Sequence, residues 1–98
     1  MSKGYWVIHI EVSDAAAYQI YREQVGAALA DFGGRFLIRA GAQSVLEGAA
    51  KPRTVVIEFP SVQAASDCYH GGKYQALLKL RLSAASADLL IVEGWDTP

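Results

Sequence analysis

The order of strand-like and helix-like hydrophobic patterns constrains the fold of this chain more than any other feature. Apolar residues recur at every second position, as in β-strands, in four segments: 5–12, 35–40, 53–59 and 88–95. They recur at spacings of three and four, as in helices, between the first two strands and between the last two. The order β-α-β-β-α-β within 98 residues predicts one domain, 1–98, of the α+β class. We expect a ferredoxin-like fold, in which a four-stranded antiparallel sheet carries its helices on one face.

Cap and stop residues mark the predicted ends of the helices. We expect Ser13 to cap the first helix and Gly33–Gly34 to end it, since glycine tolerates the left-handed conformation. Pro60–Ser61 predicts the start of a short helix that Gly71–Gly72 would end. A further helical pattern covers residues 74–81, so we expect the second helical region in two pieces.

Each strand has two faces, because successive side chains point to opposite sides. One set is wholly apolar and is predicted to lie under the helices: Trp6, Ile8, Ile10, Val12, Phe36, Ile38, Ala40, Val55, Ile57, Phe59, Leu90 and Val92. The other set mixes large apolar residues with charged ones: Tyr5, Val7, His9, Glu11, Arg35, Leu37, Arg39, Thr54, Val56, Glu58, Leu89, Ile91, Glu93 and Trp95. The second set is too apolar for a solvated face and too charged for a core, so it predicts a homodimer formed through the sheet face.

Charge and composition exclude several classes of function. A net charge of −1 and a pI near 6.0 argue against a nucleic-acid surface, which needs clustered basic residues. No apolar run approaches the roughly 20 residues of a membrane span, and we expect no signal peptide. The single cysteine, Cys68, allows no intrachain disulfide, so a cytoplasmic protein is expected. Since GxGxxG, Walker and metal-ligand spacings are lacking, we expect no cofactor and no metal.

Four side chains from four strands form the candidate site on the mixed face: His9, Arg39, Glu58 and Glu93. A histidine beside a carboxylate could act as a general base, so His9 and Glu58 are the predicted catalytic residues. Arg39 could hold a carboxylate or an enolate, and Glu93 could line the same cavity. The alternative is an ion-pair network that only stabilises the dimer interface.

Three further residues are candidates for ligand binding. Tyr5 shares the parity of His9. Tyr18 lies on the first helix, where it is either a core aromatic or part of a pocket lining. Arg81 shares a helical stripe with apolar residues and could either anchor an anionic ligand or pair with Glu58, because a buried guanidinium needs a partner.

Several sequence blocks, spread over essentially the whole chain, are specific when taken together. They are Tyr5-Trp6, Gly33-Gly34-Arg35-Phe36-Leu37-Ile38-Arg39, Val45-Leu46-Glu47-Gly48, Val55-Val56-Ile57-Glu58-Phe59-Pro60-Ser61, Tyr74-Gln75 and Val92-Glu93-Gly94. With these blocks the chain resembles the uncharacterised family catalogued as domain of unknown function 1330. The resemblance implies a dimeric α+β barrel, in which two ferredoxin-like subunits pair through their sheets. Related barrels include cofactor-free monooxygenases, lactone isomerases and haem-degrading enzymes, so the fold does not choose the function.

The residues and the resemblance leave three functions open. The first is a homodimeric small-molecule-binding protein, which as an enzyme would act on a small anionic substrate by proton transfer without a cofactor. The second is a metabolite-binding module without catalysis. The third is a structural dimer whose polar interface is an ion-pair network.

Overall fold

The computed structural model describes residues 2–96, and its elements follow the predicted order. The strands are β1 (Gly4–Val12), β2 (Arg35–Arg39), β3 (Arg53–Phe59) and β4 (Ala85–Glu93). The helices are α1 (Ala15–Ala30), α2 (Val62–His70) and α3 (Gly72–Ala84). The break between α2 and α3 at Gly71 confirms that the second helical region has two pieces.

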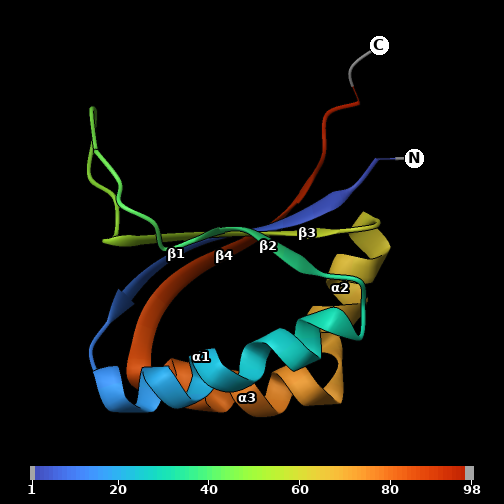
Figure 1. Ribbon diagram of the computed structural model, residues 1–98. Coiled ribbons are helices and arrows are strands. Elements are labelled where there is room, and N and C mark those ends of the chain that lie inside the picture. Colours follow the sequence, from blue (N-terminus) through green and yellow to red (C-terminus); the bar gives the residue numbers. More distant parts are fainter. Residues whose placement is uncertain (1, 97–98) are drawn as a thin grey trace.

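The strands form one antiparallel sheet in the order β2-β3-β1-β4. The helices lie on one side of this sheet, with α1 and α3 packed side by side (Figure 1). This arrangement confirms the predicted ferredoxin-like α+β fold. We call the other side of the sheet the open face.

Side-chain caps begin α1 and α2. Asp14, and not the predicted Ser13, caps α1 by accepting a hydrogen bond from the Ala17 backbone N–H at 3.1 Å. Ser13 instead donates its hydroxyl to the Ala84 carbonyl at 3.0 Å, where α3 ends. Ser61 caps α2 as expected, accepting from a backbone N–H at 3.0 Å. Helices α1 and α2 therefore each begin at the residue that follows the capping side chain.

The core lies between the sheet and the helices, around Trp6. Its indole N–H donates to the Ala65 carbonyl of α2 at 3.0 Å. Its ring packs against Phe59 and Tyr74, with centroids 5.2 and 4.8 Å away. Tyr74 reaches α1 through a hydroxyl contact with Tyr21 at 2.9 Å. Since burial of a large side chain contributes roughly 1.5–3 kcal/mol, this aromatic cluster holds all three helices on the sheet.

The predicted faces of β4 are wrong by one residue. The register places Leu89 opposite Ile8 and Ile91 opposite Trp6. The side chains of Leu89 and Ile91 therefore face the helices. Leu90 and Val92 therefore lie on the open face, where they are 50% and 44% exposed. Residues 89–92 are all apolar, so their own alternation could not reveal the register.

The same correction removes Glu93 from the predicted site. It lies opposite Gly4, at the end of β4, with the parity of the helix side and not that of His9. Its side chain is exposed. The prediction that Glu93 shares a cavity with His9 is therefore wrong.

A β-bulge at Leu37 reverses the faces of the β2 residues that follow it, Ile38 and Arg39. The residues placed opposite each other are Arg35 and Glu58, Phe36 and Ile57, Ile38 and Val56, and Arg39 and Val55. After the bulge, Ile38 lies on the open face and Arg39 on the helix side, which is the reverse of the prediction. The extra residue is unpaired, and nothing in the alternating sequence marks it.

No helix within residues 2–96 is long and apolar enough to cross a membrane. The cytoplasmic location expected from the composition stays a prediction.

Candidate functional site

The structure divides the predicted site residues between the two sides of the sheet. The open face carries Tyr5, His9 and Glu58. The helix side carries Tyr18, Arg39 and Arg81. On the open face, His9 lies opposite Thr54 while Glu58 lies opposite Tyr5. Since about 13 Å of extended strand separates these two positions, the predicted pairing of His9 with Glu58 does not occur.

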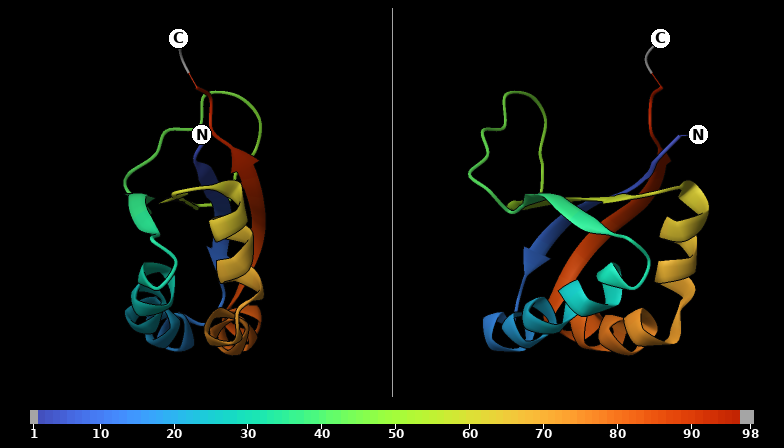
Figure 2. Two further views of the ribbon diagram at one scale, coloured as in Figure 1. Left: turned by 90° about the vertical axis from the view of Figure 1, so that its right-hand side faces the viewer. Right: turned by 45° about the vertical axis from the view of Figure 1, so that its right-hand side comes forward.

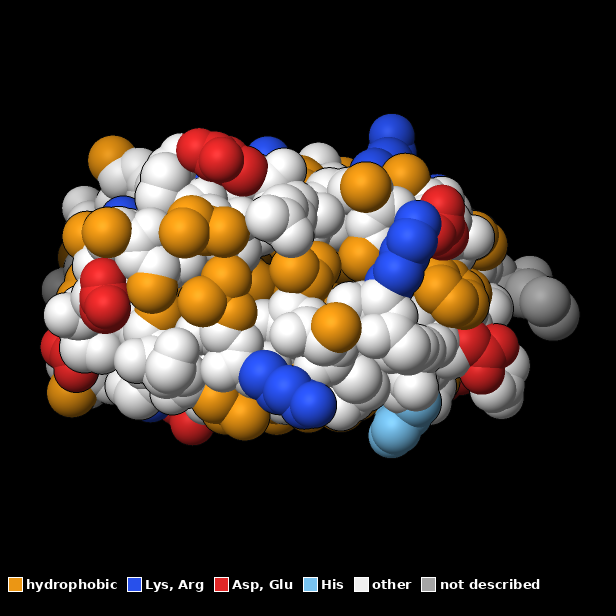
Figure 3. Space-filling view, turned by 90° about the horizontal axis from the view of Figure 1, so that it is seen from below, with side chains coloured by type: hydrophobic (Ala, Val, Ile, Leu, Met, Phe, Trp, Pro, Cys, Tyr) orange, Lys and Arg blue, Asp and Glu red, His pale blue; other side chains and the backbone are white. Residues whose placement is uncertain are grey.

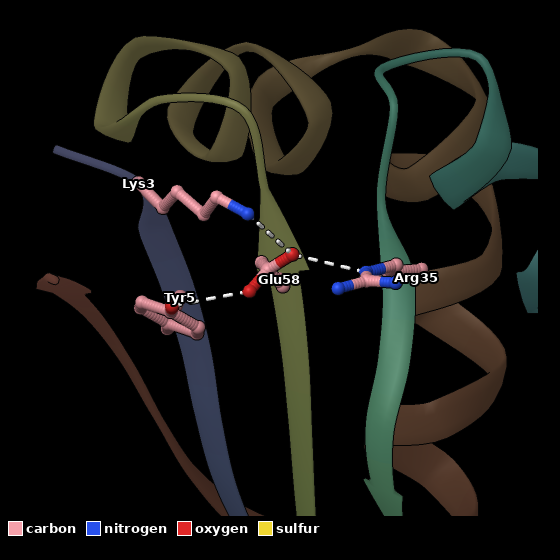
Figure 4. Close-up of polar contacts among 4 residues, drawn as sticks. All are labelled: Lys3, Tyr5, Arg35 and Glu58. Carbon is pink, nitrogen blue, oxygen red and sulfur yellow. Dashed lines mark hydrogen bonds and ion pairs between the residues drawn. The ribbon is translucent and has the colours of Figure 1, made fainter. Parts of the chain in front are cut away.

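Glu58 is the acceptor of a compact polar network on the open face (Figure 4). It accepts hydrogen bonds from Arg35 Nε at 2.9 Å, the Tyr5 hydroxyl at 3.1 Å and Lys3 Nζ at 3.2 Å. Desolvation by itself would raise the pKa of Glu58, but hydrogen bonds from Lys3, Arg35 and Tyr5 outweigh it and lower that pKa. A carboxylate held charged by three donors fits the ion-pair alternative better than a general base.

Asp88 is the carboxylate that faces His9. The two residues lie opposite each other on β4 and β1, and Lys51 donates a hydrogen bond to Asp88. That hydrogen bond and the Lys51 charge lower the pKa of Asp88, with a smaller contribution from His9. On the neighbouring strand β3, Thr54 Oγ1 lies 3.4 Å from His9 Nδ1. Asp88 was not among the predicted site residues, because the predicted faces of β4 were wrong by one residue.

An open hollow of about 590 Å³ lies beside His9. It is lined by His9, Glu11, Ala49, Ala50, Lys51, Pro52 and Asp88. The hollow is walled on one side by the segment that precedes β3 and is otherwise open to solvent. We call it the His9 hollow.

A second cavity lies on the helix side, between α1 and the β2–β3 edge of the sheet. It is lined by Ile8, Ile10, Tyr18, Tyr21, Arg22, Val25, Phe36, Arg39, Ala40, Arg53, Val55 and Ile57, and we call it the arginine cavity. Its lining is aliphatic and aromatic except for three guanidinium groups, and it contains no carboxylate. The enclosed space is about 30 Å³, enough for one or two water molecules.

Two of the three arginines cover aromatic side chains of this cavity. The Arg39 guanidinium lies 4.1 Å from the centroid of the Phe36 ring and donates to the Arg22 carbonyl of α1 at 2.9 Å. The Arg53 guanidinium lies 5.4 Å from the centroid of the Tyr18 ring. Among residues 2–96, none of the ion pairs involves Arg22, Arg39 or Arg53.

Arg81 adds a fourth cation behind the cavity wall. It is 5% exposed, and its Nε has no hydrogen-bond partner within the described part of the chain. Burial raises the pKa of Tyr18, while the charges of Arg53, Arg81 and Arg22 partly counteract that rise. Burial and the Tyr74 hydroxyl raise the pKa of Tyr21 further. Both tyrosines are therefore neutral hydroxyl groups in a positive environment, able to donate hydrogen bonds but unsuited to act as bases.

Arg22 and Arg53 were not among the predicted site residues, although the sequence carries a signal for each. Arg53 has the parity of Val55 and Ile57, so it is a charged residue on an otherwise apolar inward face. Arg22 follows Tyr18 by four residues on α1, the spacing that places two side chains on one helical side.

Cys68 does not extend either site. Burial, with a smaller contribution from the charge of Asp31, raises the pKa of its thiol to about 11. Its sulfur lies 3.7 Å from the Ala28 carbonyl in the core. Within residues 2–96, no three His, Cys, Asp or Glu side chains gather in a way that could hold a metal ion.

Solved structures share this backbone fold at low sequence identity. A protein of unknown function from Rhodopseudomonas palustris has a TM-score of 0.79 at 17% identity, over 98% of this chain and 85% of that one. SnoaB, a cofactor-independent oxygenase from Streptomyces nogalater, has a TM-score of 0.66 at 13% identity, over 99% and 97%. A possible oxidoreductase of unknown function from Bacteroides thetaiotaomicron has a TM-score of 0.57 at 10% identity, over 94% and 97%.

A comparison with curated proteins gives no match. These likenesses show that the chain shares the α+β fold of SnoaB and of the two proteins of unknown function. Residues 3–95 match the family model described as Domain of unknown function (DUF1330), so the chain belongs to this family, as its sequence blocks predicted.

Proposed function

We propose that the protein is a homodimer that binds a small, planar, anionic molecule in the arginine cavity of each subunit. The observation that carries this proposal is the set of three guanidinium groups around an aromatic cavity, none of them in an ion pair within residues 2–96. Guanidinium groups bind carboxylates through paired hydrogen bonds and stack on flat rings.

The walls of the cavity select for shape. Phe36 and Tyr18 contribute aromatic rings, each with a guanidinium over one face, while Val25 and Val55 supply aliphatic contacts. A flat ligand ring would lie between these side chains, with its anionic group directed to the arginines. The tyrosine hydroxyl groups would supply hydrogen bonds to an oxygen of the ligand.

Entry requires the arginine side chains at the mouth to move, because the enclosed space is only about 30 Å³. Arg39 is exposed, and one hydrogen bond to the Arg22 carbonyl holds it across Phe36. Long charged side chains change rotamer readily when their heads are in water. An incoming carboxylate would replace that single hydrogen bond with charge-assisted ones.

Exposed apolar side chains on the open face support the homodimer. They include Ile38, Leu90 and Val92, which are each at least 44% exposed. The helices also expose apolar side chains, with Ile20 49% and Leu82 66% exposed, and Figure 3 shows apolar side chains among charged ones on this side. A second sheet packed on the open face would cover Ile38, Leu90 and Val92 while leaving the arginine cavity free.

A cofactor-independent reaction is the second candidate, favoured by the fold shared with SnoaB. Proton transfer would need a base, and His9 with Asp88 opposite it is the arrangement that could supply one. Non-catalytic binding of a metabolite and a purely structural dimer remain the alternatives. Replacing His9 with glutamine would leave any turnover unchanged if His9 is not the base.

Calorimetric titration with four ring compounds tests anion binding. We expect benzoate and salicylate to bind, and neutral benzamide and cationic benzamidine not to bind. The double variant Arg39→Gln/Arg53→Gln should lose about tenfold or more in benzoate affinity. Lys79→Gln removes one charge from an exposed position of α3 and should bind benzoate like the unchanged protein. Equal binding of benzoate and benzamidine, or an unaffected double variant, would refute the proposal.

A further inference from the structure

We propose that two segments projecting from the sheet pack around a second copy of this chain and close the His9 hollow. The first is the projecting loop, residues 40–52 between β2 and β3. The second is the C-terminal segment, residues 94–96 after β4. This inference rests on the homodimer proposed above, and it adds the residues that make the contact and the site that the contact completes.

Both segments rise from the side of the sheet away from the helices. Figure 1 shows the projecting loop in green near one end of the sheet and the C-terminal segment in red near the other. Both views in Figure 2 show the two segments on the side away from the helices, and the right-hand view shows them at opposite ends of the sheet. A second sheet packed on the open face would therefore meet one segment at each end.

The projecting segments carry the most exposed large apolar side chains among residues 2–96. Leu46 in the loop is 91% exposed, and Trp95 in the C-terminal segment is 85% exposed. Val45 is 49% exposed beside Leu46. Exposed apolar surface that is continuous with a sheet face is typical of an interface between protein subunits.

The area of the open face indicates that the sheet alone is too small. With four strands of five to nine residues, and spacings of about 4.8 Å between strands and about 3.3 Å along them, the face measures roughly 450–500 Å². A standard interface buries about 800 Å² on each partner. The two projecting segments supply the contact area that the flat face lacks.

Hydrogen bonds hold both segments in their projecting positions. Gln43 bridges the base of the loop, because its amide donates to the Lys51 carbonyl at 3.0 Å and accepts from Thr54 Oγ1 at 2.8 Å. The Gly94 N–H donates to the Lys3 carbonyl at 2.7 Å, beside Trp95. Segments that are already held in place lose little conformational entropy when they bind a partner.

The His9 hollow is incomplete in one subunit. Its wall is formed by residues 49–52 at the base of the projecting loop, and it is otherwise open. A second copy seated between the two projecting segments would cover this opening and enclose His9 with Asp88 and Lys51. The dimer would then hold a closed polar chamber that a monomer lacks.

Sedimentation and tryptophan fluorescence test this inference. Trp6 is fully buried and Trp95 is exposed in one subunit, so the emission lost in Trp95→Phe isolates the Trp95 signal. In the intact dimer we expect Trp95 emission to be blue-shifted and protected from iodide. Leu46→Ser should raise the dimer Kd about tenfold or more. Leu82→Ser is the matched control, because Leu82 is 66% exposed on α3 and should leave that Kd unchanged.

The outcomes separate this inference from the proposed function. A dimer with an iodide-accessible Trp95 and an unaffected Leu46→Ser variant overturns the inference and keeps the homodimer. A monomer overturns both. Benzoate binding to the arginine cavity is measured independently and is affected by neither result.

Discussion

Replacing Arg81 with methionine should stabilise the unliganded protein while weakening its affinity for anions. Arg81 is 5% exposed, its Nε has no hydrogen-bond partner within residues 2–96, and no ion pair there includes it. An unsatisfied buried donor costs about 1–3 kcal/mol, and more when it is charged. Methionine keeps an unbranched apolar stem of similar reach, so most packing contacts survive.

The expected gain is about 1–3 kcal/mol in the free energy of unfolding, or about 4–8 °C in melting temperature per kcal/mol for a domain of this size. Urea denaturation at a fixed protein concentration measures it, since dimerisation makes stability concentration-dependent. Lys79→Met also replaces a long cationic side chain with methionine, but at an exposed position of α3, and should shift stability by less than about 0.5 kcal/mol.

Benzoate titration supplies the second half of the prediction. Arg81 lies close enough to Tyr18 to affect its pKa, so its charge should favour an anion in the adjoining arginine cavity. We expect Arg81→Met to bind benzoate several-fold more weakly than the unchanged protein. A variant that loses more than about 1 kcal/mol of stability without ligand would show that Arg81 already has a partner within the fold, and the reasoning would be refuted.

Three further predictions concern titration, hydrogen bonding and thiol reactivity. The pKa of Glu58 is lowered in the folded protein, so its contribution to stability is present above the ordinary value of 4.5 and is lost as the pH falls through the lower, folded pKa. Urea midpoints measured across this range should fall more steeply for the unchanged protein than for Glu58→Gln, and parallel curves would contradict the network. Tyr21→Phe and Tyr74→Phe should each cost about 1–3 kcal/mol, because each leaves one buried hydroxyl without its partner. The double variant should cost clearly less than their sum, and strict additivity in a double-mutant cycle would contradict this coupling. Cys68 is 1% exposed and has a thiol pKa of about 11, so Ellman's reagent should react with it only in urea. Rapid modification of the native protein would show that the core opens around α2.

The local pattern of apolar residues was sufficient to predict the strands and helices and most of the core. The strands, the broken second helical region and the aromatic cluster around Trp6 all follow from alternation, helical spacing and glycine positions. The parity of β1 and β3 was correct, because the inward positions 6–12 and 55–59 are all apolar, while His9, Glu11, Thr54 and Glu58 mark the outward positions. The family match agrees with the blocks quoted from the sequence.

The composition of the candidate site depends on how the strands pair, and the local hydrophobic pattern does not predict strand pairing. Leu37 is an ordinary strand residue in sequence, but its bulge moves Arg39 from the open face to the arginine cavity. Asp88 faces His9 only because β4 pairs with β1 in one particular register.

Side-chain periodicity predicts which segments are strands and helices, and hence the fold, because it reports which local conformation can bury an apolar face. Which charged residues meet depends on how the strands pair in three dimensions. A shift of one residue in strand register turns every side chain to the opposite face, and that register is set by hydrogen bonds to neighbouring strands far away in sequence.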